Sequence, residues 1–204
     1  MKILCVSDTV VSQMENAAHL RRRYNDVDML ISCGDMPSAY LEFITSVLNI
    51  PLFYVRGNHD TSYTEMPPGG EDLHGQLVQW RGIRLFGLEG SIRYNNGPIQ
   101  YTEGQYRTMV YSKIFPFGLK RLTSKEPVMD IFVTHASPRG IHDREDLPHQ
   151  GISAFLTFMD LYHPRYMVHG HVHTYDRRDV VKTQYHDTIV MNINPVTLLE
   201  IEAT

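Results

Sequence analysis

Cysteine is scarce in this chain. The 204-residue sequence has only Cys5 and Cys33, and both lie inside apolar runs rather than in a spaced framework. Such usage is typical of a reducing compartment, where thiols act as small hydrophobic side chains. The two residues fall on neighbouring predicted strands, so a disulfide is the alternative, but buried free thiols are the commoner outcome. We predict two unpaired and unreactive thiols.

Long apolar runs and a basic surplus are also missing. Only about six apolar residues precede Asp8, too few for a signal-peptide core, and no run approaches the roughly 20 residues that cross a bilayer. We therefore expect a cytoplasmic protein without membrane contact. The net charge of −4 disfavours a protein that grips a nucleic-acid backbone, so we expect no stable nucleic-acid binding.

The sequence does contain enough apolar material for one core. Apolar residues make up 42% of the chain, and it has no internal repeat, low-complexity segment or linker-like change of composition. A chain of this length and composition is sufficient for one globular domain with a sizeable core. We predict a single domain over residues 1–204.

Strand and helix signals alternate in the first half, and strands dominate the second. The predicted strands lie at residues 2–7, 29–33, 51–58, 75–80, 83–90, 129–135 and 165–173, with two or three more in 183–202. The predicted helices lie at residues 12–24, with Ser12 as N-cap, and at 39–48, 102–115 and 151–163. Near-continuous apolar strands imply a sheet that is buried on both faces. The fold class is therefore α/β (α+β), a four-layer α/β/β/α sandwich of two packed mixed sheets flanked by helices.

Polar residues gather where the predicted strands end. In an open parallel sheet the carboxyl ends of the strands share one rim, where ligands bind, so residues far apart in the chain can meet there. The candidates are Asp8, Asp35, Asn58, His59, Asp60, His135, His171 and His173. Carboxylate, amide and imidazole donors without thiolate suit Mn, Fe, Zn or Ni rather than a structural zinc cage. A carboxylate can bridge two such ions, which together polarise a phosphoryl group and activate water, so the set predicts phosphoester hydrolysis.

Five motifs in order resemble the signature of the calcineurin-like metallophosphoesterases. They are Asp8, Gly34-Asp35, Gly57-Asn58-His59-Asp60, His135 and Gly170-His171-Val172-His173. The resemblance covers nearly the whole chain, and residues 91–125 form a lineage-specific loop and helix segment. It implies a first metal site of Asp8, Asp35 and His173 and a second of Asp35, Asn58, His135 and His171, with Asp35 bridging the two divalent ions. It also implies that His59 acts at the phosphate, as a charge stabiliser or proton donor, with Asp60 orienting its ring.

The first motif departs from the family pattern. The resemblance leads us to expect Asp-x-His, but the chain reads Asp8-Thr9-Val10, and an aliphatic side chain cannot coordinate a metal. We therefore expect the first site to be weak, empty or differently occupied. Two carboxylates and one histidine can still hold Mn or Fe, though less tightly. A replacement ligand, His142 or Asp143, is an alternative without support from spacing.

Three interpretations belong to different classes. The first is a working metal-dependent phosphoester hydrolase, and the second is a non-catalytic relative that serves as a binding scaffold, like the family's retromer component. The third treats Asp8 and Asp35 as helix caps and the histidines as polar core or surface residues. We favour the hydrolase because a scaffold has no use for His59. We interpret His169 as a supporting or surface residue and His149 as a surface or locally bonded residue.

Two arginines and one segment are the candidates for substrate contacts. Arg56 precedes the Gly-Asn-His-Asp motif and Arg139 follows His135, where a guanidinium could meet a phosphate, with surface ion pairing as the equal alternative. Residues 91–105 contain tyrosines that could form a wall over the rim and suit a nucleoside or aryl group. Family analogy and the absence of a cation cluster favour a small phosphodiester substrate, nucleotides included, over a monoester.

Overall fold

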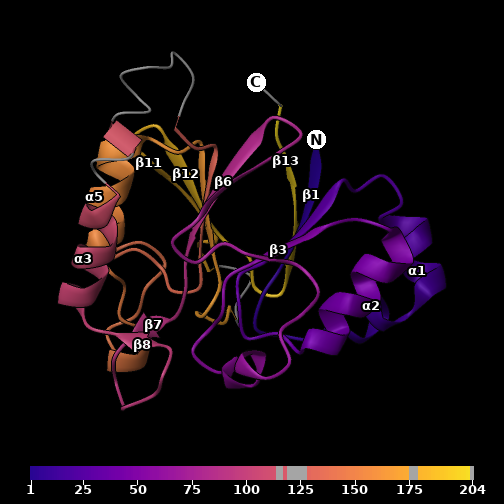
Figure 1. Cartoon of the computed structure of the whole chain (residues 1–204), viewed down its shortest axis with the longest axis horizontal. Coiled ribbons are helices and arrows are strands. Elements are labelled where there is room, and N and C mark those ends of the chain that lie inside the picture. Colours follow the sequence, from indigo (N-terminus) through magenta and orange to yellow (C-terminus); the bar gives the residue numbers. More distant parts are fainter. Residues whose placement is uncertain (114–116, 119–127, 175–178, 203–204) are drawn as a thin grey trace.

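The apolar run at the amino terminus forms β1, the centre of the first sheet. The computed structural model describes residues 1–113, 117–118, 128–174 and 179–202. The strand order of this sheet is β13-β1-β2-β3-β4, and all its pairings are parallel except that of β13 with β1. The strands are β1 (Lys2–Val6), β2 (Met29–Ser32), β3 (Leu52–Tyr54), β4 (Glu71–Asp72) and β13 (Val196–Glu200). Because β13 pairs with β1, the two ends of the chain lie side by side (Figure 1).

A second mixed sheet packs against the first. Its order is β11-β12-β10-β9-β6-β5, with parallel pairing in the centre and antiparallel pairing at both edges. The strands are β5 (Leu77–Trp80), β6 (Ile83–Leu88), β9 (Ile131–Thr134), β10 (Tyr166–His169), β11 (Lys182–Tyr185) and β12 (Thr188–Asn192). Two short strands, β7 (Ser91–Ile92) and β8 (Gln100–Tyr101), pair with each other.

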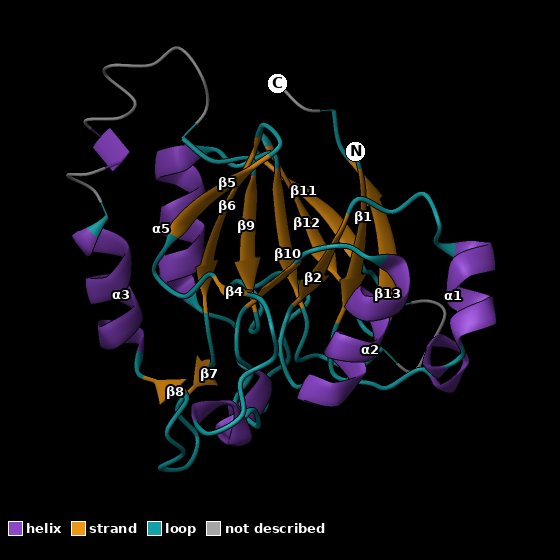
Figure 2. Ribbon diagram, turned by 45° about the vertical axis from the view of Figure 1, so that its right-hand side comes forward, coloured by secondary structure: helices purple, strands orange, loops and turns teal. Residues whose placement is uncertain are grey.

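Helices cover both outer faces, which gives four layers. Helices α1 (Ala17–Arg23) and α2 (Ser38–Leu48) lie on one side, and α3 (Glu103–Ser112) and α5 (Ser153–Tyr162) lie on the other (Figure 2). One apolar cluster, with Ile31 and Val133, fills the space between the sheets, and two further clusters join each sheet to its helices. The predicted α/β/β/α sandwich of two mixed sheets is confirmed. In the described ranges no helix is both long and apolar enough to span a membrane.

Three local predictions need correction or confirmation. The helix predicted at residues 12–24 is wrong at its start, because Ser12–Glu15 forms a 3-10 turn and Asn16 is extended. The Asn16 side chain then caps α1 by accepting the His19 N–H, so Asn16 and not Ser12 is the N-cap. The short strands β4, β7 and β8 lie in segments predicted as loops. Cys5 and Cys33 are buried and unpaired, as predicted.

Candidate metal centre

Three candidate ligands have a backbone conformation that residues other than glycine rarely adopt. Asp8, Asp35 and His171 have φ values of 63°, 56° and 67°. Each comes two or three residues after the end of a strand, β1, β2 or β10, and turns the chain sharply at the rim of the sheets. Left-handed non-glycine residues cost about 1–3 kcal/mol each and persist where the surroundings determine them, most often at functional sites.

The glycines of the motifs let the backbone approach these side chains closely. A Cβ added at Gly57 would overlap Asp35 Oδ1, and one at Gly170 would overlap Ser7 Oγ and Asp8 Oδ2. Gly34 has φ +96° and equally little room beside Gly57. The glycines are therefore required by the packing of the loops against one another, which brings the ends of both sheets together.

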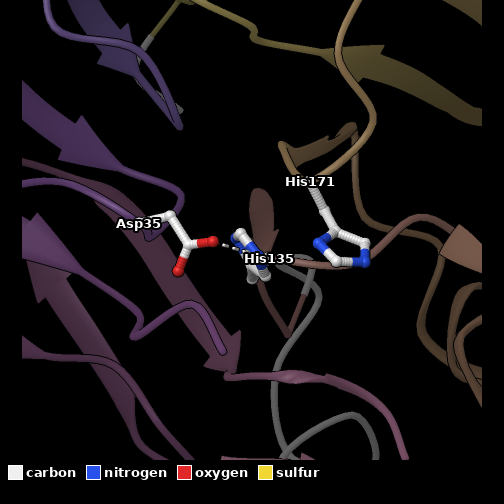
Figure 3. Close-up of side chains that lie close together, drawn as sticks. All are labelled: Asp35, His135 and His171. Carbon is white, nitrogen blue, oxygen red and sulfur yellow. Dashed lines mark ion pairs between the residues drawn. The ribbon is translucent and has the colours of Figure 1, made fainter. Parts of the chain in front are cut away.

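Asp35, Asn58 and His135 converge on one point. His135 Nε2 lies 3.1 Å from Asn58 Oδ1 and 3.4 Å from Asp35 Oδ2. Potential ligand atoms of Asp35, His135 and His171 all lie within 4.8 Å of one another (Figure 3). Metal–ligand bonds of about 2.0–2.2 Å place the ligands of one ion roughly 3 to 3.5 Å apart, so this donor set fits a divalent transition-metal ion with little movement.

Backbone carbonyls fix which nitrogen of each imidazole faces this point. His135 Nδ1 lies 2.8 Å from the Cys33 carbonyl, and His171 Nε2 lies 2.7 Å from the Pro148 carbonyl. A carbonyl only accepts, so each of these nitrogens carries a hydrogen and donates it. The opposite nitrogens, Nε2 of His135 and Nδ1 of His171, are then the ones available to a metal, as in sites where an outer partner orients the ligand.

The charges of the metal-free site support the same conclusion. Burial by itself would lower the pKa of His135, but the Asp35 carboxylate raises it to about 9. Burial by itself would raise the pKa of Asp35, but His135 lowers it to about 2. His135 is therefore an imidazolium whose Nε2 proton lies between the Asp35 and Asn58 oxygens, where a cation is favoured. Burial lowers the pKa of His171 to about 3, so this ligand is already neutral.

The residues of the first candidate site also have hydrogen-bond partners, but Val10 stands where the family pattern has a further donor. Asp8 Oδ2 accepts the His171 N–H at 2.9 Å, and His173 Nδ1 lies 3.4 Å from Asn194 Nδ2. Val10 is 40% exposed and offers no donor. The alternative ligands have partners elsewhere: His142 lies 3.0 Å from His169 Nε2, and Asp143 accepts the Gly151 N–H at 3.1 Å.

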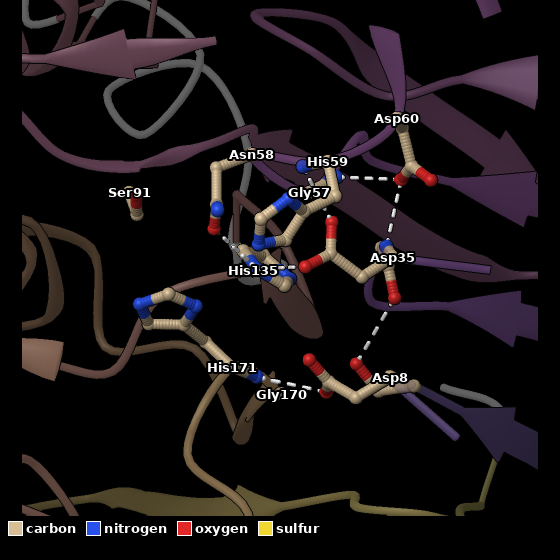
Figure 4. A network of polar contacts seen from close by, with 12 residues as sticks. Asp8, Asp35, Gly57, Asn58, His59, Asp60, Ser91, His135, Gly170 and His171 are labelled. Carbon is tan, nitrogen blue, oxygen red and sulfur yellow. Dashed lines mark hydrogen bonds and ion pairs between the residues drawn. The ribbon is translucent and has the colours of Figure 1, made fainter. Parts of the chain in front are cut away.

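His59 and Asp60 follow the second-site residue Asn58 and differ in exposure. The His59 side chain is exposed, while its N–H donates to Asp35 Oδ1 at 2.8 Å. Asp60 is buried, and one of its oxygens accepts the N–H groups of Asp35 and Gly57, both at 2.7 Å (Figure 4). Asp60 thus fastens two motif loops to each other, in place of the expected contact with the His59 ring. Burial raises its pKa to about 6.

A cavity of about 460 Å³ lies at the first candidate metal site and the His59 motif. Its lining comprises Asp8, Asp35, Met36, Pro37, His59, Asp60, Ser62 and His173. The cavity therefore brings together the first-site candidates, the bridging candidate Asp35 among them, and His59, whereas Asn58, His135 and His171 are not among its lining residues. It is open enough for a small substrate to reach the rim where the ligands lie.

The two predicted substrate arginines lie in ion pairs. Arg56 donates to both oxygens of Glu89, at 2.6 and 3.0 Å, and the Glu89 side chain is only 1% exposed. Arg139 is 46% exposed, with its Nε 3.9 Å from Asp143. Neither arginine is among the residues that line the cavity at the metal sites. Their contact with substrate stays a prediction.

Two further histidines lie near His171. His149, predicted as a surface or locally bonded residue, has its Nδ1 2.5 Å from Asp146 Oδ2, but the sequence did not predict that its ring centroid lies 5.1 Å from that of His171. His169 is fully buried, its Nδ1 donates to the Gly170 carbonyl, and its Nε2 must then accept from His142. No sequence spacing marks the contacts of His149 and His142, because these residues approach His171 and His169 only in the folded chain.

The chain belongs to the calcineurin-like phosphoesterase family. The family model matches residues 1–175, which include all five motifs. Members of this family are metal-dependent phosphoester hydrolases that use divalent ions, and the donor set at the rim fits that chemistry. A search of curated proteins finds no significant match.

Solved structures show the same fold at low sequence identity. The protein TT1561 of Thermus thermophilus matches with a TM-score of 0.65 and 16% identity, covering 95% of this chain and 89% of its own. GAP50, described as the anchor in the inner membrane complex of Plasmodium, matches with a TM-score of 0.50 and 10% identity, covering 94% and 70%. At such identities the likeness concerns the fold alone.

Proposed function

We propose that this chain is a phosphodiesterase that binds one divalent transition-metal ion tightly in the second site and a further ion weakly in the first. Asp35, Asn58, His135 and His171 would hold the second-site ion, and Asp8, Asp35 and His173 the first-site ion. When bound, such ions polarise the phosphoryl group and lower the pKa of water for attack. Small phosphodiesters, nucleotides among them, are the proposed substrates.

The residues of the chain would divide the remaining work. His59 is exposed at the cavity beside Asp35, where its imidazole can stabilise charge on the phosphoryl group or protonate the leaving oxygen. Asp60 would act through the backbone, since it holds Gly57 and Asp35 in one arrangement. Asp60 was predicted as a catalytic residue, and we propose that it acts as a positioning residue.

The lining of the cavity favours a diester over a monoester. Among the described residues that line it there is no lysine or arginine, and Arg56 is bound to Glu89. A monoester dianion carries more charge than a diester anion and gains more from a nearby guanidinium. We therefore propose that diesters are hydrolysed in preference to monoesters.

The fixed ring orientations of His135 and His171 are the observation that carries this function. A polar core histidine needs only one hydrogen-bond partner, whereas these two are each turned by a carbonyl so that the other nitrogen faces Asp35. The test is hydrolysis of bis-p-nitrophenyl phosphate by chelator-stripped protein, with Mn, Fe(II), Ni, Zn or Mg added back. We expect activity to return with a transition metal and to fall about 10²-fold or more in His59→Ala.

Two outcomes would overturn parts of this proposal. Folded protein that is inactive with every metal would favour the second candidate function, a binding scaffold. Val10 supports that candidate, because a valine in place of the family's histidine removes a ligand of the first site. The similarity to GAP50, an anchor by its description, supports only the possibility that this fold serves such a role. Faster hydrolysis of p-nitrophenyl phosphate than of the diester would contradict the substrate preference.

A further inference from the structure

Tyr94 contacts a candidate metal ligand from outside every family motif. It lies in the loop between β7 and β8, and its hydroxyl accepts a hydrogen bond from Asn58 Nδ2 at 3.2 Å. At the other end of the same amide, Asn58 Oδ1 lies 3.1 Å from His135 Nε2. Asn58 is thus held at both of its polar atoms, and Oδ1 is directed toward the point where the second-site donors converge.

An asparagine ligand depends on such partners. The oxygen and the NH₂ group of an amide are nearly equal in size, so packing alone does not decide which of them faces an ion. Only the oxygen can coordinate a cation, because the amide nitrogen has no free lone pair to donate. A partner that receives Nδ2 therefore restricts the side chain to the orientation that binds metal.

Hydrogen bonds fix the backbone of the loop that carries Tyr94. Gln100 is 3% exposed, and its Oε1 accepts the N–H groups of Tyr94 and Asn95 at 3.3 and 3.1 Å. The Arg93 N–H donates to the Tyr101 carbonyl at 3.0 Å. A buried side chain thus fixes the backbone of Tyr94, so the hydroxyl is placed without depending on a bound substrate.

A second connection fastens the same loop to the Gly-Asn-His-Asp motif. The Tyr101 hydroxyl donates to Glu89 Oε1 at 2.5 Å, and Glu89 also receives both donors of Arg56. Arg56 immediately precedes Gly57 and Asn58. This part of the chain therefore holds the motif at two points, where Tyr94 contacts the Asn58 side chain and where Tyr101 of β8 contacts Arg56 through Glu89.

We propose that Tyr94 is a positioning residue of the second metal site. Its hydroxyl holds the Asn58 amide with Oδ1 toward the ion and so raises the affinity of that site. The inference rests on the proposed function in one respect, namely that Asn58 is a metal ligand. It gives the lineage-specific segment a role in metal binding in addition to its expected role as a wall over the rim.

The test measures metal binding directly. Chelator-stripped wild type, Tyr94→Phe and the control Tyr111→Phe are titrated with manganese(II) chloride by calorimetry. Loss of the partner of a metal ligand costs roughly 10-fold to 100-fold in affinity, and we expect Tyr94→Phe to show about a tenfold weaker Kd. Tyr111 is 53% exposed on α3, so its variant should bind as the wild type does. Thermal unfolding of the metal-free variants verifies that each is folded.

A double-mutant cycle with Asn58→Ala separates positioning from a general effect. If Tyr94 acts through Asn58, Tyr94→Phe should cause no further loss of manganese affinity in the Asn58→Ala background. Equal losses in both backgrounds, or an unchanged Kd in Tyr94→Phe, would overturn the inference alone. A folded wild type that binds none of manganese(II), iron(II), nickel(II) and zinc(II) in the same titration would overturn the proposed function and this inference with it.

Discussion

The two candidate metal sites at the rim share Asp35 but differ in the donors that the sequence supplies. In the second site each ligand has a fixed partner: Cys33 for His135, Pro148 for His171, Tyr94 for Asn58 and His59 N–H for Asp35. In the first site Val10 stands where the family pattern has a histidine, and it is 40% exposed. A metal site needs donors and partners that orient them, and the first candidate site lacks the donor that the family pattern has at position 10.

Removal of His135, the central donor of the second site, should cause the largest loss of metal binding and activity. His135→Ala takes away a donor that lies against both Asp35 and Asn58. We expect tight metal binding to be lost and diester hydrolysis to fall by about 10³-fold, since a bound ion supplies several kcal/mol of charge stabilisation. Metal content after dialysis and the rate with bis-p-nitrophenyl phosphate provide the measurement. His19→Ala, on α1, is the control, and an active, metal-loaded His135→Ala would refute the assignment of the second site.

A histidine at position 10 should raise the metal affinity of the first site toward that of the second. Val10→His places an imidazole at an exposed position, where a substitution usually changes stability by less than about 0.5 kcal/mol. We expect a second ion to bind about tenfold more tightly or better, so that the metal stoichiometry of the dialysed protein rises from one to two. Val10→Ala is the control, because it removes the valine side chain without adding an imidazole. A stoichiometry of two already in the wild type would mean that another group completes the first site, and a stoichiometry that stays at one would contradict the expected role of position 10.

The sequence predicted the candidate metal ligands at the rim better than the residues that hydrogen-bond to them. Asp35 and His135 were predictable because each follows an apolar run, and parallel strands bring such ends together. The partners of Asp60, Asn58 and His171 were not, because Tyr94 lies 36 residues from Asn58 and Pro148 lies 23 residues from His171, on loops without periodic pattern. The break before α1 was missed for a local reason, since Ser12 and Asn16 are both good caps and only tertiary packing chooses between them.

The smallest expected effect concerns the protonation of His135 and His171, the two imidazoles of the second site. In the metal-free protein Asp35 outweighs burial and raises the pKa of His135 to about 9, so His135 is protonated at pH 7, whereas burial lowers the pKa of His171 to about 3 and leaves it neutral. A metal ion must replace the His135 proton and no proton of His171. Binding at pH 7 should therefore release about one proton, and the apparent affinity should rise about tenfold per pH unit until it levels near pH 9.

Calorimetry in two buffers of different ionisation enthalpy measures this proton release. The same titration above pH 9 is the internal control, because His135 is then already neutral and the release should fall toward zero. A release near zero at pH 7 would show that His135 is neutral in the metal-free protein, and the ion pair with Asp35 would then not prepare the site for a cation. A release near two would show that His171 also binds a proton at pH 7, against its buried position beside Pro148.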